Sequence, residues 1–261
     1  MHTKHGIRRN FARRAATYDA HARVQRLMAD ELLRLIGDAV TQAQKILEIG
    51  CGTGYLTRAL RCLNPQAWLV AVDLDGRLIR TARNKLNGDH RTTWLVADGE
   101  TMTRGAFNLI ISNSTFQWFC QPGETLKTCA ERLTPGGTLA FAAMGPRTFH
   151  ELGASLKIAE AGRASPVDIP AAGFLGRDAW EDLLKQAGFV EVCTAGRLLV
   201  LDFPSVRDFL KSIQATGATN PHPRPFSSRV FQAMLAAYQE RFAKNGSIPA
   251  SYELIWALAR K

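Results

Sequence analysis

Residues 45–60 read KILEIGCGTGYLTRAL. The apolar-rich run at 46–49 predicts a short buried β-strand. Gly50, Gly52 and Gly54 follow it, and a helical pattern begins directly after them. Glycine lets the chain turn sharply and lets a ligand approach the main chain without meeting a Cβ. Strand, glycine turn and helix together predict the first unit of a nucleotide-binding α/β sheet, with the ligand at the carboxyl end of the strand.

The spacing of these glycines separates the turn from other nucleotide-binding turns. Dinucleotide enzymes carry Gly-x-Gly-x-x-Gly, whereas this chain has Gly-x-Gly-x-Gly, and the Gly-Lys-Ser/Thr of a P-loop is missing. Glu48 lies just before the turn, and a carboxylate there suits a cationic or neutral ligand better than a polyphosphate. The pattern resembles motif I of the class I S-adenosylmethionine-dependent methyltransferases, whose ligand carries a sulfonium and an ammonium.

The next strand also ends in polar residues. An apolar run at 68–72 leads into Asp73-Leu74-Asp75, about twenty positions after the glycines, where a ribose-binding acid is expected. We expect Asp73 to bind the two ribose hydroxyls because it lies at the strand end. Asp75 is expected to cap the following helix.

Further apolar runs at 92–97, 107–112 and 137–143 predict additional strands. The first leads into Asp98-Gly99, at the place where the family contacts the adenine amino group. The second leads into Asn113, where the family forms the floor beneath the reactive methyl group. The resemblance thus implies a cofactor site made of Glu48, Gly50, Gly52, Gly54, Asp73, Leu74, Asp98, Gly99 and Asn113.

The 261 residues, 46% of them hydrophobic, are enough for one large α/β domain. We expect a Rossmann-like class I methyltransferase sheet, parallel except for an antiparallel C-terminal strand, the latter by analogy with the family. The expected segments are entrance helices at 1–36, a nucleotide-binding core at 37–203, a helical lid insertion at 204–247 and a last strand at 248–261. Helices are predicted at 147–160, 178–186, 206–213 and 227–243, with a proline-rich turn at 220–225.

Composition also indicates where the protein works. The sequence has no apolar run of about eighteen residues and no apolar signal core at its start. Its five cysteines are scattered and show no metal-ligand spacing. We therefore expect a cytoplasmic protein with reduced thiols, no metal and no membrane partner.

Charge is unevenly distributed along the chain. The formal net charge is +10, of which +6 falls in residues 1–26 and +4 in residues 204–247. A basic roof over a neutral body would steer a polyanion toward the cofactor. RNA, DNA, an acidic carrier protein or an anionic small molecule would each fit this pattern.

The N-terminal segment narrows the choice. Phe11, Ala15, Tyr18-Asp19 and Gln25 match the pattern of the entrance helix of the malonyl-acyl-carrier-protein O-methyltransferases of biotin synthesis. Stretches at 112–119, 145–152 and 209–220 are similar to other segments of that family. The resemblance implies methyl transfer from S-adenosylmethionine to the free carboxylate of a malonyl thioester, carried by an acyl carrier protein or coenzyme A. S-adenosylhomocysteine would be the by-product.

Such a carboxylate is already ionised at pH 7, so the reaction needs no general base. The protein has to position the substrate and exclude water. We expect Tyr18 to lie over the methyl group or to donate to the substrate carboxyl. Arg147, Lys211 and Arg14 compete as the cation that binds the carboxylate, and the position of Arg147 is often acidic in relatives.

Other functions stay open at this point. One alternative is a small-molecule carboxyl methyltransferase of the trans-aconitate type. A nucleic-acid methyltransferase is disfavoured because Ser112-Asn113-Ser114-Thr115 stands where base-modifying enzymes often carry Asn-Pro-Pro-Tyr. A cofactor-binding regulator without activity is a further alternative. The sequence does not decide between carrier protein and coenzyme A, nor does it give the oligomeric state.

Overall fold

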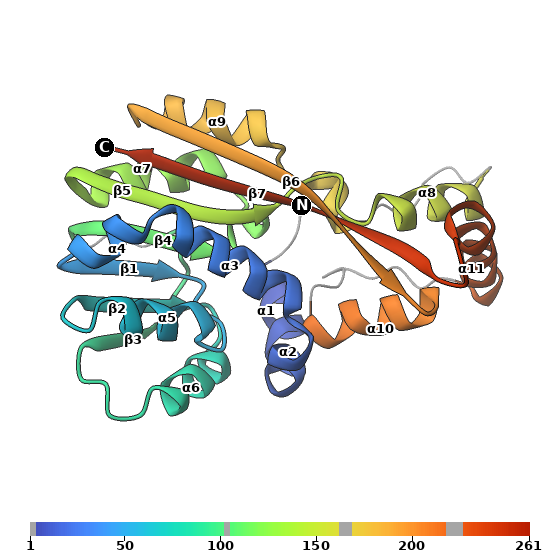
Figure 1. The fold of residues 1–261 in the computed structure, drawn as a ribbon, viewed down its shortest axis with the longest axis horizontal. Coiled ribbons are helices and arrows are strands. Elements are labelled where there is room, and N and C mark those ends of the chain that lie inside the picture. The colour runs from blue at the N-terminus through green and yellow to red at the C-terminus, as the bar shows by residue number, and fades with distance from the viewer. Residues whose placement is uncertain (1–3, 102–104, 162–168, 218–226) are drawn as a thin grey trace.

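The computed structural model describes residues 4–101, 105–161, 169–217 and 227–261 (Figure 1). Within these ranges, seven strands form one sheet in the order β3-β2-β1-β4-β5-β7-β6, and β7 runs antiparallel to both of its neighbours. Every strand that the sequence predicts is present, and the predicted fold class is confirmed. The strands are β1 Lys45–Ile49, β2 Trp68–Asp73, β3 Thr92–Val96, β4 Phe107–Asn113, β5 Leu133–Met144, β6 Glu191–Phe203 and β7 Ile248–Arg260.

The register brings the polar strand ends to one edge of the sheet. Ile49 of β1 pairs with Val72 of β2 and with Ser112 of β4, and Asp73 pairs with Val96 of β3. Because these strands are parallel, the residues that follow each of them emerge side by side. The fold therefore collects residues from distant parts of the sequence at the carboxyl edge.

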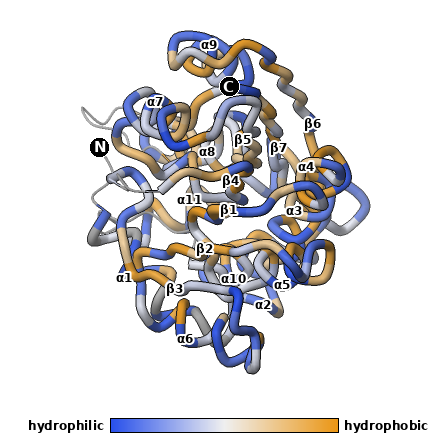
Figure 2. Tube along the Cα trace, turned by 90° about the vertical axis from the view of Figure 1, so that its left-hand side faces the viewer, coloured by the Kyte–Doolittle hydropathy of each residue, from blue (hydrophilic) through white to orange (hydrophobic). Residues whose placement is uncertain are grey.

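Helices cover both faces of the sheet, as expected for a doubly wound α/β fold. On one face, Met28 and Leu32 are fully buried, and the Trp256 indole N–H donates to the Met28 carbonyl at 3.0 Å. On the other face, Trp180 and Leu184 are fully buried against the strands. Hydrophobic and hydrophilic stretches alternate along peripheral helices such as α9 (Figure 2). The helices are α1 Lys4–Arg13, α2 Ala15–His21, α3 Arg23–Leu35, α4 Gly37–Gln42, α5 Tyr55–Leu63, α6 Gly76–Lys85, α7 Pro122–Arg132, α8 His150–Ala159, α9 Arg177–Gln186, α10 Val206–Thr216 and α11 Ser228–Phe242, with 3-10 turns η1 Phe116–Trp118 and η2 Pro170–Gly173.

The β6–β7 hairpin extends beyond the rest of the sheet and carries the insertion between its two strands (Figure 1). Helix α10 lies against α2, whereas α11 packs on α8. Tyr238 of α11 is fully buried, and its hydroxyl donates to the Pro249 carbonyl at 2.8 Å. The insertion thus splits between the N-terminal helices and the outer end of the hairpin, and its role as a lid stays a prediction. The proline-rich turn at 220–225 lies outside the described residues.

Local boundaries follow from backbone conformation. The predicted cap is confirmed, because Asp75 accepts the Arg77 N–H at 2.9 Å and begins α6. The helix predicted to begin at Arg147 begins instead at His150, because Phe149 adopts a left-handed conformation with φ of 59°. A residue in that conformation cannot continue a right-handed helix.

Candidate active site

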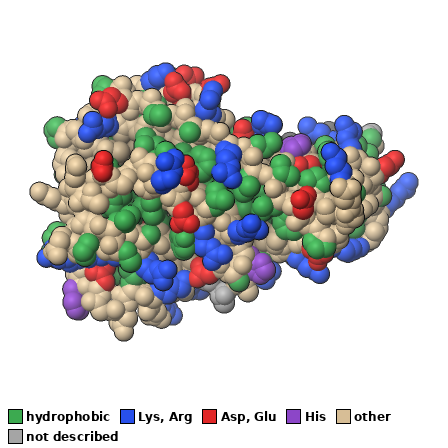
Figure 3. Space-filling view, in the orientation of Figure 1, with side chains coloured by type: hydrophobic (Ala, Val, Ile, Leu, Met, Phe, Trp, Pro, Cys, Tyr) green, Lys and Arg blue, Asp and Glu red, His purple; other side chains and the backbone are tan. Residues whose placement is uncertain are grey.

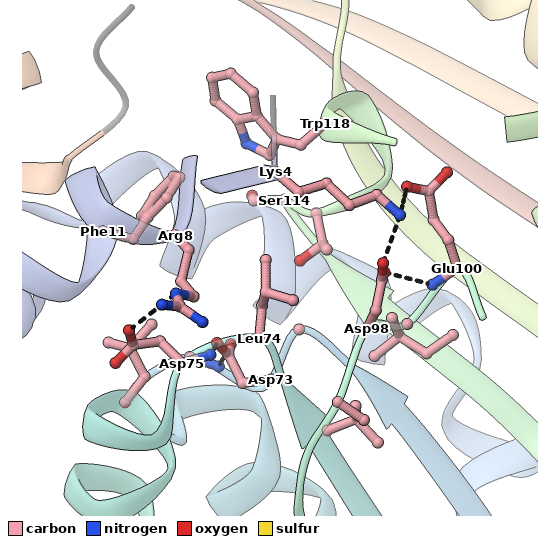
Figure 4. A pocket seen from close by; sticks show the side chains of 18 of the residues that line it. Lys4, Arg8, Phe11, Asp73, Leu74, Asp75, Asp98, Glu100, Ser114 and Trp118 are labelled. Atoms are coloured by element: carbon pink, nitrogen blue, oxygen red, sulfur yellow. Dashed lines mark hydrogen bonds and ion pairs between the residues drawn. The ribbon is translucent and has the colours of Figure 1, made fainter. Parts of the chain in front are cut away.

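A cavity lies at the carboxyl edge of the sheet, between the strand ends and the N-terminal helices (Figure 4). The ends of β1, β2, β3 and β4 form its floor and walls, and α1 and α2 cover it. The residues that line it include Lys4, Arg8, Phe11, Tyr18, Gly50, Gly52, Thr53, Asp73, Leu74, Asp75, Asp98, Gly99, Glu100, Asn113, Ser114 and Trp118.

The glycine turn permits close approaches that a side chain would block. Gly50, Gly52 and Gly54 have φ of 76°, 55° and 88°, a region that favours glycine. A Cβ on Gly50 would lie 2.0 Å from the Thr115 hydroxyl oxygen. A Cβ on Gly54 would lie 2.9 Å from the Ala82 Cβ, so this glycine lets α5 approach α6. Gly50 and Gly52 line the cavity, whereas Gly54 does not.

Asp73 is fixed at the centre of the cavity wall. Its Oδ2 accepts the Gly52 N–H at 2.9 Å, and its Oδ1 accepts the Asp75 N–H at 3.0 Å. Burial raises the pKa of the Asp73 carboxyl to about 6, although these backbone N–H groups oppose the shift. Each oxygen keeps a free lone pair, so the side chain can still accept from two hydroxyl groups.

Glu48 and Asn113 lie beside a depression that adjoins the cavity and shares Tyr18, Gly50 and Gly52 with it. Burial, with a smaller contribution from Asp73, raises the pKa of Glu48 to about 8. Neither Glu48 Oε2 nor Asn113 Oδ1 has a hydrogen-bond partner among the described residues. Buried acceptors without a partner cost free energy, so a donor that reached them would be bound tightly.

Two carboxylates at the opposite end of the cavity bind a lysine from α1. Lys4 Nζ lies 2.5 Å from Asp98 Oδ2 and 2.6 Å from Glu100 Oε2 (Figure 4). Burial alone would lower the pKa of Lys4, but the two carboxylates raise it above its usual value. Glu100 is held in place by the Gln121 N–H, which donates to its Oε1 at 2.8 Å. The ion pairs fasten the first turn of α1 to the residues that follow β3.

Tyr18 is held over the glycine turn through its neighbour in α2. The Thr53 hydroxyl donates to Asp19 Oδ1 at 2.5 Å, and Lys85 donates to both the Asp19 carboxylate and the Thr53 carbonyl. Burial, and then the carboxylates of Asp73 and Asp19, raise the pKa of Tyr18 well above its usual value. The Tyr18 hydroxyl is therefore protonated at neutral pH and can donate a hydrogen bond.

The three cations predicted to bind a substrate carboxylate do not line the cavity. Arg14 is exposed at the joint between α1 and α2. Lys211 is exposed on α10 and lies 3.5 Å from Asp208 Oδ1. Arg147 lies in a separate depression, and its backbone N–H donates to Glu253 at 2.8 Å. Their substrate roles stay predictions.

The fold also brings into the cavity several residues that were not predicted to line it. Lys4, Arg8 and Phe11 point inward from one face of α1, and Arg8 Nε lies 4.0 Å from Asp75 Oδ2 (Figure 4). Their i, i+4, i+7 spacing on a predicted helix is the signal that was available. Trp118 packs edge-on against Phe11, with ring centroids 5.9 Å apart.

Two further findings concern the described part of the chain as a whole. It contains no group of three or more His, Cys, Asp or Glu side chains arranged to hold a metal ion. None of its helices is long and apolar enough to cross a bilayer.

Comparison with solved structures shows the fold. A crystal structure from Bacillus halodurans C-125, described as a methyltransferase candidate, matches with a TM-score of 0.60 and 16% identity, over 89% of this chain and 99% of that one. A Haemonchus contortus phosphoethanolamine N-methyltransferase in complex with S-adenosylhomocysteine matches with a TM-score of 0.52 and 17% identity, over 84% of this chain and 49% of that one. A family model described as a methyltransferase domain matches residues 47–139.

Sequence relatives are closer and align over nearly the whole chain. A malonyl-[acyl-carrier protein] O-methyltransferase from Anoxybacillus flavithermus is 40% identical over 98% of this chain and 97% of its own length. One of the same name from Geobacter sulfurreducens is 34% identical over 98% of both chains. These matches confirm the resemblance seen in the N-terminal helices. The protein is a methyltransferase and belongs to the malonyl-[acyl-carrier protein] O-methyltransferase family.

Proposed function

We propose that the protein methylates the free carboxylate of a malonyl thioester, carried by an acyl carrier protein, with S-adenosylmethionine as the methyl donor. The product would be a malonyl methyl ester, formed at an early step of biotin synthesis. The substrate part of the proposal rests on the full-length relatives. The cofactor part rests on one observation, the buried Oε2 atom of Glu48, which lacks a hydrogen-bond partner among the described residues and lies beside the glycine turn.

The residues of the cavity fit S-adenosylmethionine at three places. Glu48 Oε2 and Asn113 Oδ1 would accept from the ammonium group, which supplies the donors that both atoms lack. Asp73 would accept from the ribose hydroxyls, and Asp98 from the adenine amino group. Gly50 and Gly52 would leave room for the ligand, and Leu74 and Gly99 would contact the adenine ring. The carboxylates that line the cavity outnumber its cations, Lys4 and Arg8, so the lining disfavours a polyphosphate.

When bound, S-adenosylmethionine supplies a methyl group activated by its positive sulfur. The substrate carboxylate is ionised at neutral pH, so no side chain has to remove a proton. Its oxygen would form the new bond to the methyl carbon while the bond from that carbon to sulfur breaks, and S-adenosylhomocysteine would leave. Tyr18 would hold the other carboxylate oxygen through its protonated hydroxyl. A neutral donor fixes the carboxylate while withdrawing less charge from it than an ion pair would.

The cover formed by α1 and α2 would exclude water from this reaction. Phe11, Tyr18 and Trp118 present aromatic rings to the cavity. Holding the two reacting groups together in an aligned position can lower the barrier by roughly 7–11 kcal/mol. Positioning alone can therefore account for much of the proposed catalysis.

The proposal is tested by offering the protein labelled S-adenosylmethionine and a panel of thioesters. We expect label in malonyl carrier protein and in malonyl-CoA, and far less in acetyl carrier protein or in the malonyl methyl ester. Equal labelling of acetyl and malonyl thioesters would contradict a carboxylate acceptor. Tight binding of NAD or ATP without binding of S-adenosylhomocysteine would contradict the cofactor.

A further inference from the structure

Helix α1 has two faces of different character. Lys4, Arg8 and Phe11 line the cavity from one face. Successive residues of a helix are rotated by about 100°, so Arg9 and Arg13 lie on the opposite, outer face. Both arginines are exposed. The helix that covers the cavity therefore presents positive charge to the outside.

The cations on the two faces also differ in their partners. Lys4 is paired with Asp98 and Glu100 on the inner face. Arg9 and Arg13 make no hydrogen bond or ion pair with any described residue. The α1–α2 segment holds a single acid, Asp19, which is already engaged by Lys85 and Thr53. The charge of the outer face is thus not neutralised within its own segment.

Helix α10 lies directly against the two N-terminal helices. The Thr17 hydroxyl donates to the Ala215 carbonyl at 3.1 Å. A Cβ on Gly217, which follows α10, would lie 2.8 Å from the Asn10 carbonyl oxygen, so the backbones are in close contact. Lys211 of α10 has three quarters of its side chain exposed, but it is paired with Asp208. The unpaired positive charge beside the cavity is therefore that of α1.

We infer that this surface, the outer face of α1 with Arg9 and Arg13 at its centre, is the docking surface for the acyl carrier protein. The inference rests on the proposed function. A carrier protein is too large to enter the cavity, so it must dock beside the opening and extend its acyl group inward. Helix α1 both lines the cavity and faces the outside, so its outer face lies on the surface that surrounds the cavity. Unneutralised cations there would attract a partner rich in carboxylates and speed its association, in a way that salt weakens.

The end formed by α8 and α11 is the competing location, because it also carries Lys and Arg side chains (Figure 3). Arg229 and Arg241 of α11 are exposed there. However, α11 packs on α8, and no described residue of either helix lines the cavity. This end is thus basic without bordering the proposed reaction site.

The test compares two malonyl substrates, one attached to the carrier protein and one without it. Malonyl carrier protein requires docking, whereas malonyl pantetheine has the same thioester without a protein or a phosphate. For Arg9→Glu/Arg13→Glu, we expect kcat/KM with the carrier protein to fall about tenfold or more at low salt, and by much less in high salt. With malonyl pantetheine, kcat/KM of the same variant should stay within about twofold of the value for the unmodified protein. Arg9→Gln/Arg13→Gln should show a smaller loss in the same direction.

Control variants carry the same charge change elsewhere. We expect kcat/KM with both substrates to stay nearly unchanged in two control variants. One is Arg229→Glu/Arg241→Glu on α11, and the other is Arg80→Glu/Arg83→Glu at exposed positions of α6. The inference is overturned if the α11 double variant loses kcat/KM with the carrier protein only. It is also overturned if the α1 double variant loses kcat/KM equally with both substrates, or with neither. If the unmodified protein methylates neither substrate, the proposed function has failed instead. Equal thermal melting of all variants excludes misfolding as the cause.

Discussion

The floor of the cavity is built from strand ends and the glycine turn, whereas its cover consists of α1 and α2. The floor is held by main-chain contacts, such as the Gly52 and Asp75 N–H groups that both donate to Asp73. The cover is held by the packing of α2 on α10 and by side-chain ion pairs, from Lys4 to Asp98 and Glu100 and from Lys85 to Asp19. Partly exposed ion pairs contribute little to stability and are screened by salt. The floor is therefore fixed by the main chain, whereas part of what holds the cover is sensitive to salt.

Removing the central acid of the floor should have the largest effect. We expect Asp73→Ala to weaken binding of S-adenosylhomocysteine about 100-fold, because two charged hydrogen bonds of about 1.5 kcal/mol each are lost. Asp73→Asn keeps one acceptor oxygen, so its affinity for S-adenosylhomocysteine should fall by less. Isothermal calorimetry measures both, with Asp178→Ala, at an exposed position of α9, as the control. Unchanged affinity in Asp73→Ala would show that another residue binds the ribose.

The floor should also make cofactor binding depend on pH through Glu48. Its pKa is raised to about 8 by burial, so the carboxyl is mostly protonated in the free protein at pH 7. It must lose this proton to accept from an ammonium group, so binding of S-adenosylhomocysteine should release a proton. Affinity should rise with pH by up to about tenfold per unit and level off above about pH 8.

Calorimetry in two buffers of different ionisation enthalpy counts the protons released. Glu48→Gln should bind S-adenosylhomocysteine more weakly, and its affinity should no longer depend on pH between pH 6 and 8. Below about pH 6, Asp73 adds its own dependence, because its pKa is raised to about 6. Proton release that persists in Glu48→Gln would assign the titration to another group.

The cover contributes to the reaction through Tyr18. We expect Tyr18→Phe to lower kcat/KM for the malonyl substrate about tenfold, the value of one hydrogen bond of about 1.4 kcal/mol. Binding of S-adenosylhomocysteine should change by less than about twofold, because the aromatic ring is kept. Steady-state kinetics and calorimetry separate the two effects. An unchanged kcat/KM in Tyr18→Phe would show that Tyr18 contributes to the reaction through its aromatic ring and not through its hydroxyl.

The smallest effect should come from loosening the cover. Lys4→Met removes the ion pairs to Asp98 and Glu100, and we expect S-adenosylhomocysteine to dissociate about two- to fivefold faster. In the unmodified protein, added salt should raise the dissociation rate of S-adenosylhomocysteine by a similar factor. In Lys4→Met, added salt should change this rate little. Stopped-flow displacement measures the rate. A dissociation rate that depends on salt equally in both proteins would show that these ion pairs do not hold the cover.

The floor and the presence of N-terminal helices above it could be predicted from sequence, whereas the contacts that hold these helices could not. Buried parallel strands are apolar, so Asp73, Asp98 and Asn113 stand out where such strands end, and parallel pairing brings them together. The contacts of Lys4 depend on how a helix lies against distant loops, which no local pattern specifies. Gly54 shares the glycine pattern, and it lies where α5 approaches α6 rather than in the wall of the cavity. Arg14, Arg147 and Lys211 likewise lie outside the cavity wall, because tertiary packing sets their positions, and the predicted roles of these four residues stay predictions.

The central claim is that a methyl group is transferred to the free carboxylate of malonyl carrier protein. The most direct test is intact-protein mass spectrometry of the carrier after incubation with the enzyme and S-adenosylmethionine. The account predicts that the malonyl carrier gains the mass of one CH₂, that cleavage of the thioester with neutral hydroxylamine removes this gain together with the acyl group, and that the acetyl carrier is unchanged. No gain on the malonyl carrier, or a gain that stays on the carrier after the thioester is cleaved, would contradict it.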